Sequence, residues 1–125
     1  MYNTYMRKIL LVEDDQFIKD IYIQMLTPNF EVDAAEDGKT AYGKIIKNTY
    51  DLILLDMYLP IMDGKPVFEL LEKNFPNKYK SKIVFMTNDD SEQTIKYFNG
   101  SGIKYLIKSA LNPEEFVKKV KGYIG

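Results

Sequence analysis

Leu52-Ile53-Leu54-Leu55-Asp56 is the most apolar run of the chain, and it ends in a carboxylate. Unbroken aliphatic runs of this kind are typical of central strands in a parallel sheet, where helices cover both faces. Pro60 and the pair Asp63-Gly64 follow the run and predict a loop. A lone carboxylate at the end of a buried strand is expensive to remove from water, so we expect Asp56 to have a partner.

Other short apolar runs alternate with amphipathic segments along the rest of the chain. Strands are predicted at about 9–12, 30–34, 52–55, 83–86 and 105–107. Segments with helical spacing follow them, at about 17–25, 41–46, 67–71, 90–99 (stopped near Gly100) and 113–124. Strict alternation predicts parallel strands joined by right-handed crossovers, and hence a three-layer α/β sandwich. The five units use residues 1–125, so we expect a single domain.

The composition narrows the chemistry that is available. The 125 residues include 17 Lys and Arg against 18 Asp and Glu, a net charge of -1, and there is no Cys, His or Trp. These absences exclude disulfides, thiolate metal sites, the usual zinc sites and Ser-His hydrolase chemistry. No apolar run approaches the roughly 20 residues that span a bilayer, so we expect a cytoplasmic protein without membrane insertion.

Polar side chains follow four of the predicted strands directly. They are two acids after the first strand, one acid after the third, a hydroxyl and an amide after the fourth, and an ammonium group after the fifth: Glu13, Asp14, Asp56, Thr87, Asn88 and Lys108. In an open parallel sheet ligands bind outside the carboxyl ends of the strands. We therefore expect these side chains to share one edge, while Asp15 is expected to cap the first helix.

The grouping of acids predicts a cation and a phosphoryl group. Glu13, Asp14 and Asp56 would repel one another in a small cleft unless a cation lay among them, and an all-oxygen ligand set fits Mg²⁺. The cation would screen Asp56 from an incoming phosphoryl group, so that its carboxylate can attack phosphorus. Thr87 and Lys108 would then contact the transferred oxygens.

On these residues the chain resembles the receiver domain of two-component response regulators, the chemotaxis-regulator-like family. The resemblance rests on Leu11–Asp15, Asp51–Gly64, Met86-Thr87 and Tyr105–Lys108, and it covers essentially the whole chain. It implies a flavodoxin-like (βα)5 sandwich with strand order 2-1-3-4-5. It also implies a signalling phosphoacceptor that catalyses only its own phosphorylation and slow dephosphorylation.

The same resemblance implies a role for each site residue. Asp56 is the phosphoacceptor, and Thr87, Asn88, Lys108 and the switch aromatic Tyr105 bind the phosphoryl group or respond to it. The Mg²⁺ ligands are Glu13, Asp14, Asp56 and the backbone carbonyl of Tyr58. The side chains of Tyr58 and Asp89 tune dephosphorylation, and we expect the bulk of Tyr58 to slow it.

Two positions depart from the family pattern. Ser109 follows Lys108, where family members usually have a proline preceded by a cis peptide bond. A cis bond before a residue other than proline costs about 3–4 kcal/mol, so the sequence leaves a trans bond and a strained cis bond as alternatives. Asn88 stands where a smaller residue is usual, in a position to hydrogen-bond the phosphoryl group or to crowd it.

The two halves of the chain differ in charge, which bears on the partners. Residues 1–63 have a net charge of -5 and residues 64–125 a net charge of +4. The lysines of the second half are compatible with an ordinary solvated surface. The alternative hypothesis is an acidic downstream protein at a face around Lys96, Lys104, Tyr105 and Lys118. The phosphoryl donor is expected to be a histidine kinase or a histidine phosphotransfer protein. A single arginine and no helix-turn-helix argue against direct nucleic-acid binding.

Three other interpretations compete with this one. A receiver-like interaction module that is never phosphorylated is disfavoured by the intact set of acids, hydroxyl and lysine. An Asp-nucleophile phosphatase of the haloacid-dehalogenase type needs a second Asp two positions after the nucleophile, where this chain has Tyr58. Nucleotide or flavin binding is the weakest, because Gly100-Ser101-Gly102 follows a helix and lacks the third glycine of the fingerprint.

Overall fold

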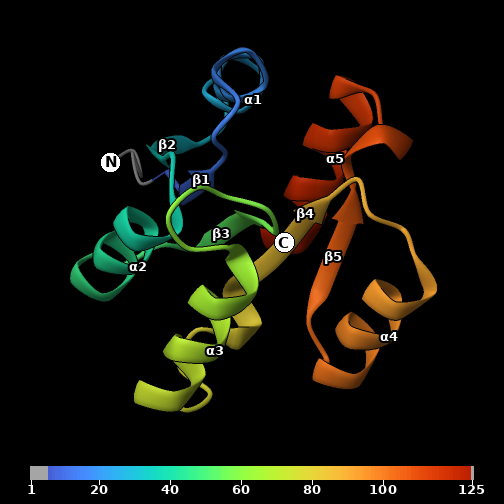
Figure 1. Ribbon diagram of the computed structural model, residues 1–125. Helices are drawn as coiled ribbons and strands as arrows, with labels where there is room; N and C mark the ends of the chain where they lie inside the picture. Colours follow the sequence, from blue (N-terminus) through green and yellow to red (C-terminus); the bar gives the residue numbers. More distant parts are fainter. Residues whose placement is uncertain (1–5, 125) are drawn as a thin grey trace.

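The structure is a computed structural model, and it describes residues 6–124. Five parallel strands form one sheet in the order β2-β1-β3-β4-β5 (Figure 1). The strands are β1 (Lys8–Val12), β2 (Glu31–Ala35), β3 (Leu52–Asp56), β4 (Ile83–Thr87) and β5 (Lys104–Ile107). The predicted α/β sandwich and its strand order 2-1-3-4-5 are confirmed, with the apolar run of β3 at the centre of the sheet.

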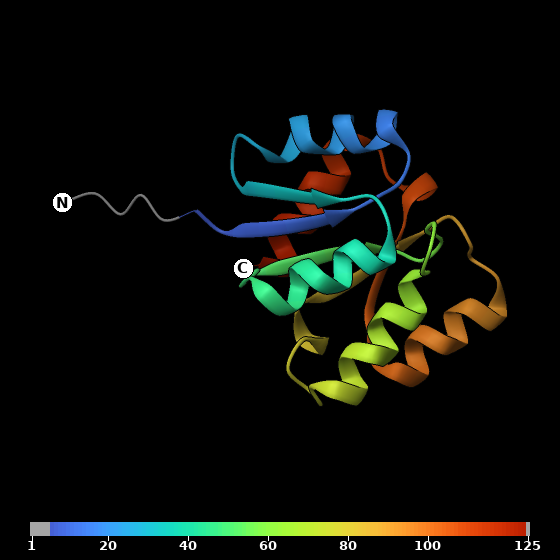
Figure 2. The ribbon, with the colours of Figure 1, turned by 60° about the vertical axis from the view of Figure 1, so that its left-hand side comes forward.

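Helices cover both faces of the sheet, as Figure 2 shows. They are α1 (Gln16–Leu26), α2 (Gly38–Lys47), α3 (Gly64–Asn74), α4 (Glu92–Ser101) and α5 (Pro113–Ile124), with single turns of 3-10 helix η1 (Lys80–Lys82) and η2 (Lys108–Ala110). Helices α1 and α5 lie on one face, and α2, α3 and α4 lie on the other. None of the helices formed by residues 6–124 is long and apolar enough to cross a membrane.

Alternate side chains of each strand enter two separate cores. In β3, Ile53 and Leu55 pack in the core under α2, α3 and α4, while Leu52 and Leu54 pack in the core under α1 and α5. This division follows from the period of two along a strand, which sends successive side chains to opposite faces. All five residues of β3 are buried, so its last residue, Asp56, is held between the two cores.

The helix ends follow ordinary capping chemistry, with one difference from the prediction. Asp15 caps α1 as expected, because its Oδ1 accepts a hydrogen bond of 3.0 Å from the amide of Ile18. The helix expected at about 90–99 begins at Glu92 and continues to Ser101. It ends there because Gly102, and not Gly100, takes the left-handed conformation with a φ of 68°.

Candidate functional site

The carboxyl ends of the strands surround a hollow of about 390 Å³. Its lining contains six of the predicted site residues: Glu13, Asp14, Asp56, Tyr58, Asn88 and Lys108. Asp15 and Ile18 at the start of α1 complete the lining. The structure therefore brings together side chains that come from the loops after β1, β3, β4 and β5, as the strand-end argument predicted.

Lys108 connects the two buried acids of the hollow. Its Nζ donates hydrogen bonds to Glu13 Oε1 at 2.8 Å and to Asp56 Oδ2 at 2.7 Å. Glu13 is 1% exposed and Asp56 is 4% exposed, so this ammonium group is the counter-charge that makes their burial tolerable. The partner that the sequence required for Asp56 is thus the lysine that follows β5.

Burial and ion pairing together raise the pKa values of both Glu13 and Lys108. Burial raises the pKa of Glu13 above its usual value, and the hydrogen bond from Lys108 only partly offsets that effect. Burial acts to lower the pKa of Lys108, but its hydrogen bonds to Asp56 and Glu13 outweigh burial and raise it overall. The lysine is therefore held in its charged form.

Three carboxylates of the hollow fit a divalent cation. Glu13, Asp14 and Asp56 each offer an oxygen, and these oxygens lie within 4.8 Å of one another. Asp14 is exposed, whereas the other two are buried. An all-oxygen set with few protein ligands matches Mg²⁺, which keeps several of its waters. The backbone carbonyl of Tyr58 stays a prediction as a further ligand.

Close packing of the loop after β3 fixes the position of Asp56. The amide of Gly64 donates to the carbonyl of Met57 at 2.9 Å, and a Cβ on Gly64 would lie 2.3 Å from the carbonyl oxygen of Asp56. Asp63 accepts a hydrogen bond from the amide of Leu59 at 2.9 Å, which closes the same loop. The Asp63-Gly64 pair is therefore required by the close approach of α3 to the end of β3.

The two departures from the family pattern are hydrogen-bonded to each other. The amide of Ser109 donates to Asn88 Oδ1 at 2.7 Å, a bond that a proline at position 109 could not make. No peptide bond within residues 6–124 is cis, so the bond between Lys108 and Ser109 is trans. The contact joins the loop after β4 to the loop that carries Lys108. Nothing local in the sequence indicates this pairing, although Asn88 and Ser109 each depart from the family pattern.

Tyr58 and Asp89, predicted to tune dephosphorylation, contact each other. The Tyr58 hydroxyl donates to Asp89 Oδ2 at 2.8 Å, and the hydroxyl of Thr94 donates to the same oxygen at 2.7 Å. The hydrogen bond to Asp89 raises the pKa of Tyr58. The hydrogen bonds from Thr94 and Ser91, with that from Tyr58, lower the pKa of Asp89 well below its usual range. Sequence analysis did not identify Thr94, because nothing local marks it.

The two predicted switch residues lie at different depths. Thr87 is 1% exposed, and its hydroxyl accepts a hydrogen bond of 3.0 Å from the amide of Asp89. Tyr105 is half-buried, and its ring stacks on Phe98 of α4 with the ring centres 4.7 Å apart. Tyr105 does not line the hollow that contains Asp56. Its ring belongs instead to the contact between β5 and α4.

The predicted downstream face is less continuous than the sequence suggested. Lys96 forms an ion pair with Glu92 at 3.4 Å on the exposed side of α4. Lys104, at the start of β5, donates to the carbonyl of Ser81 at 3.1 Å. Lys118 lines a hollow between α1 and α5. The lysines thus belong to three different parts of the surface, with Lys104 and Tyr105 adjacent on β5.

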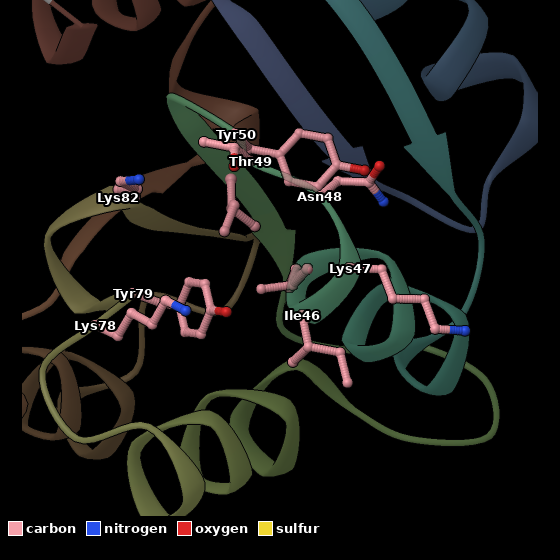
Figure 3. A pocket seen from close by; sticks show the side chains of 10 residues that line it. Ile46, Lys47, Asn48, Thr49, Tyr50, Lys78, Tyr79 and Lys82 are labelled. Carbon is pink, nitrogen blue, oxygen red and sulfur yellow. The ribbon is translucent and has the colours of Figure 1, made fainter.

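A second hollow, of about 210 Å³, lies at the opposite end of the sheet (Figure 3). It is lined by the end of α2, the start of β3 and the segment around η1, including Thr49, Tyr50, Lys78, Tyr79 and Lys82. It contains no predicted site residue and no carboxylate. The hollow at the carboxyl ends of the strands is therefore the candidate functional site.

Comparison with known proteins agrees with this geometry. The family model described as "Response regulator receiver domain" matches residues 9–121, and the chain belongs to that family. Regulatory protein VanRB of Enterococcus faecalis is 39% identical over 103 residues, which are 81% of this chain and 45% of that protein. Response regulator ArlR of Staphylococcus saprophyticus is 30% identical over 120 residues, 95% of this chain and 53% of that protein. The chain thus spans about half the length of these relatives.

Solved structures show the same architecture. Chemotaxis response regulator CheY4 of Vibrio cholerae has a TM-score of 0.81 to 0.82 in two crystal structures, one of them 27% identical and covering 95% of this chain and 99% of that one. A receiver domain protein of Methanospirillum hungatei has a TM-score of 0.81 at 27% identity, covering 96% of this chain and 94% of that one. The flavodoxin-like arrangement expected from the resemblance is therefore confirmed.

Proposed function

We propose that residues 1–125 act as one receiver unit in which Asp56 accepts a phosphoryl group from a phosphohistidine. The observation that carries this proposal is the contact of Lys108 with both Asp56 and Glu13, beside the exposed carboxylate of Asp14. A buried carboxylate with a cation on one side and further acids on the other is suited to receive a charged group. Because residues 1–125 contain no histidine, the phosphohistidine lies outside them, in a histidine kinase or a phosphotransfer protein.

The proposed transfer uses the carboxylate of Asp56 as the nucleophile. An oxygen of Asp56 forms a bond to phosphorus, the bond from phosphorus to the histidine nitrogen breaks, and the imidazole of the donor leaves with that electron pair. Lys108 and the hydroxyl of Thr87 would bind the transferred oxygens. Glu13, Asp14 and Asp56 would hold Mg²⁺, whose chemistry is to offset negative charge between the carboxylate and the phosphoryl group.

The proposed output is a change in a protein-binding surface. When Thr87 moves toward the phosphoryl group, its hydrogen bond from the Asp89 amide is exchanged, and the ring of Tyr105 shifts against Phe98 of α4. An acidic protein would recognise the lysines around Tyr105, in the cytoplasm and without direct nucleic-acid contact. Partner binding that ignores both salt and charge reversal at Lys96 and Lys104 would contradict the charge argument.

Intact mass spectrometry tests the phosphoacceptor directly. The protein is incubated with Mg²⁺ and acetyl phosphate or phosphoramidate, and a single phosphate adduct is expected on the wild type. Asp56→Ala is expected to remove the adduct, whereas Asp90→Ala, which changes an exposed acid of the loop after β4, is expected to keep it. An unmodified wild type under conditions that load a known receiver would overturn the proposal in favour of an unphosphorylated interaction module.

A further inference from the structure

A run of hydrogen bonds joins helix α4 to the loop that carries the candidate phosphoacceptor. It begins at Thr94 in the first turn of α4, passes through Asp89 in the loop after β4, and ends at Tyr58 in the loop after β3. In Figure 2 both loops leave the sheet at the same edge. Tyr58 lies 31 positions before Asp89, so only tertiary structure brings these two into contact, whereas Thr94 lies five positions after Asp89.

Asp89 is held in one arrangement by several donors. Its Oδ2 accepts from the hydroxyls of Tyr58 and Thr94, and its Oδ1 accepts from the amide of Ser91 at 3.0 Å. Its own amide donates to the hydroxyl of Thr87. These hydrogen bonds keep the pKa of Asp89 far below its usual range, so it remains an ionised acceptor at any working pH.

The hydroxyl of Thr94 is not needed to begin the helix. Ser91 caps α4, since its Oγ accepts from the amide of Thr94 at 3.3 Å, and that bond uses the backbone of Thr94 rather than its side chain. A buried Thr hydroxyl inside a helix usually bonds to the carbonyl one turn earlier. Thr94 is 7% exposed and directs its hydroxyl out of the helix to Asp89 instead. The hydroxyl of Thr94 therefore ties the first turn of α4 to the loop just before it.

The far end of the run lies beside the candidate phosphoacceptor. The amide of Tyr58 donates to Asp56 Oδ1 at 3.2 Å, and Tyr58 lines the hollow that contains Asp56. Tyr58 is 56% exposed, and the hydrogen bond from its hydroxyl to Asp89 restrains the position of the ring. A ring fixed at this position borders the hollow that contains Asp56.

We propose that Thr94 is a positioning residue for the lifetime of the phosphoryl group on Asp56, acting through Asp89 on the ring of Tyr58. This inference rests on the proposed function. In hydrolysis, a water oxygen binds phosphorus, the bond from phosphorus to Asp56 breaks, and the products are the free carboxylate, phosphate and a proton. Holding the ring of Tyr58 in place slows this attack. A partner that moves the first turn of α4 then changes the lifetime, and by linkage the phosphoryl group changes the affinity of that partner.

The test measures decay of the phosphoryl group in single and double variants. Each protein is loaded with acetyl phosphate and Mg²⁺, freed of the donor, and followed by intact mass. Thr94→Val and Tyr58→Phe are each expected to speed decay about 3-fold, because each removes one hydrogen bond of the run that holds the ring of Tyr58 and only part of that free energy affects the attack of water. The double variant is expected to decay no faster than either single variant, because both changes release the same ring. Thr94→Ser is expected to restore the wild-type rate.

Thr49→Val supplies the matched control, since Thr49 lines the hollow at the opposite end of the sheet. It is expected to decay at the wild-type rate. Wild-type decay in Thr94→Val, or effects of the two changes that multiply, would overturn the inference alone. A wild type that takes up no phosphoryl group would overturn the proposed function and this inference with it. If Thr94→Val does not fold in far-UV circular dichroism, Thr94→Ala gives the same readout.

Discussion

The two ends of the same sheet differ in how their charged side chains are buried and paired. At the carboxyl ends of the strands, Glu13 and Asp56 are buried and share the ammonium group of Lys108. At the amino ends, Lys78 and Lys82 stand beside a hollow that holds no carboxylate, and neither forms an ion pair within residues 6–124. Both ends are hollowed, so the presence of a hollow does not distinguish them.

What distinguishes them is the state of the charged groups. Surface lysines with free access to water contribute little to stability and serve mainly solubility. Buried acids around a single lysine are costly to maintain, and folding alone gives no reason to collect them. Ion pairs occur at both ends, since Arg7 pairs with a partly exposed Asp51 at the amino end. Deep burial of the paired acids, and not the size or shape of the hollows, therefore identifies the functional end of this sheet.

The largest expected difference between the two ends is their response to Mg²⁺. At a concentration 100 times the dissociation constant, Mg²⁺ should raise the free energy of unfolding by about 2.7 kcal/mol if it binds only the folded chain. Asp14→Asn is expected to remove most of this gain, because it deletes the exposed carboxylate of the acid trio. Thermal unfolding with and without Mg²⁺ measures it, with Asp90→Asn as the control. Equal gains in both variants would contradict the assignment of the cation to Glu13, Asp14 and Asp56.

Replacing one lysine at each end of the sheet should change the free energy of unfolding by different amounts. Lys108→Met leaves Glu13 and Asp56 without their counter-charge and is expected to lower the free energy of unfolding by about 2 kcal/mol, less than the roughly 3–5 kcal/mol of a fully buried pair because the Lys108 side chain is 12% exposed. Lys82→Met, at the opposite end, is expected to change it by less than about 0.5 kcal/mol. Urea unfolding at pH 7 without Mg²⁺ gives both values. If the two replacements are equally costly, the ion pairs seen at Lys108 do not stabilise the fold.

The smallest expected change in stability compares two tyrosines, Tyr50 and Tyr79, that both line the hollow at the amino end of the sheet. The Tyr50 hydroxyl donates to Asp33 Oδ2 at 2.6 Å, so Tyr50→Phe should lower the free energy of unfolding by about 1 kcal/mol. The Tyr79 hydroxyl forms no hydrogen bond with another of the residues 6–124, and Tyr79→Phe should cost less than about 0.5 kcal/mol. Chemical denaturation at neutral pH compares the two. A larger loss for Tyr79→Phe would contradict the hydrogen-bond argument.

Tyr50 also predicts how the free energy of unfolding depends on pH. Burial and the hydrogen bond to Asp33 raise the pKa of Tyr50 well above its usual 10.0. The folded state therefore keeps the phenol protonated while the unfolded chain ionises, and the stability that is present below pH 10.0 is lost as the pH rises above it. Tyr50→Phe should show a shallower loss of stability above that pH. Identical slopes for the variant and the wild type would exclude Tyr50 as the cause.

Much of the fold and of the candidate site followed from local patterns. The apolar run of β3 predicted a central strand, and five of the six side chains expected at one edge line one hollow, the exception being the buried Thr87. Both predictions depend on periodicity and on the geometry of parallel strands, which a sequence displays directly. The end of α4 was misplaced because Gly100 and Gly102 are both permissive, and only the backbone shows which one takes a positive φ.

The connections between loops did not follow from the sequence. The contact of Asn88 with Ser109 joins residues 21 positions apart, and the contact of Lys108 with Glu13 joins residues 95 positions apart. Hydrogen bonds of this kind depend on loop positions set by the whole packed sheet. No propensity or spacing encodes them, so Thr94 in particular carried no local signal.

The sequence by itself determined the α/β class, the strand that holds Asp56 and the set of side chains at its edge. These properties depend on the alternation of apolar and polar residues, which acts over a few positions. The tertiary structure decided which of those side chains share charges, which loops are tied together and how α4 is joined to Tyr58. The physical reason is range: hydrogen bonds and ion pairs between loops form only after two cores have fixed where the strands end.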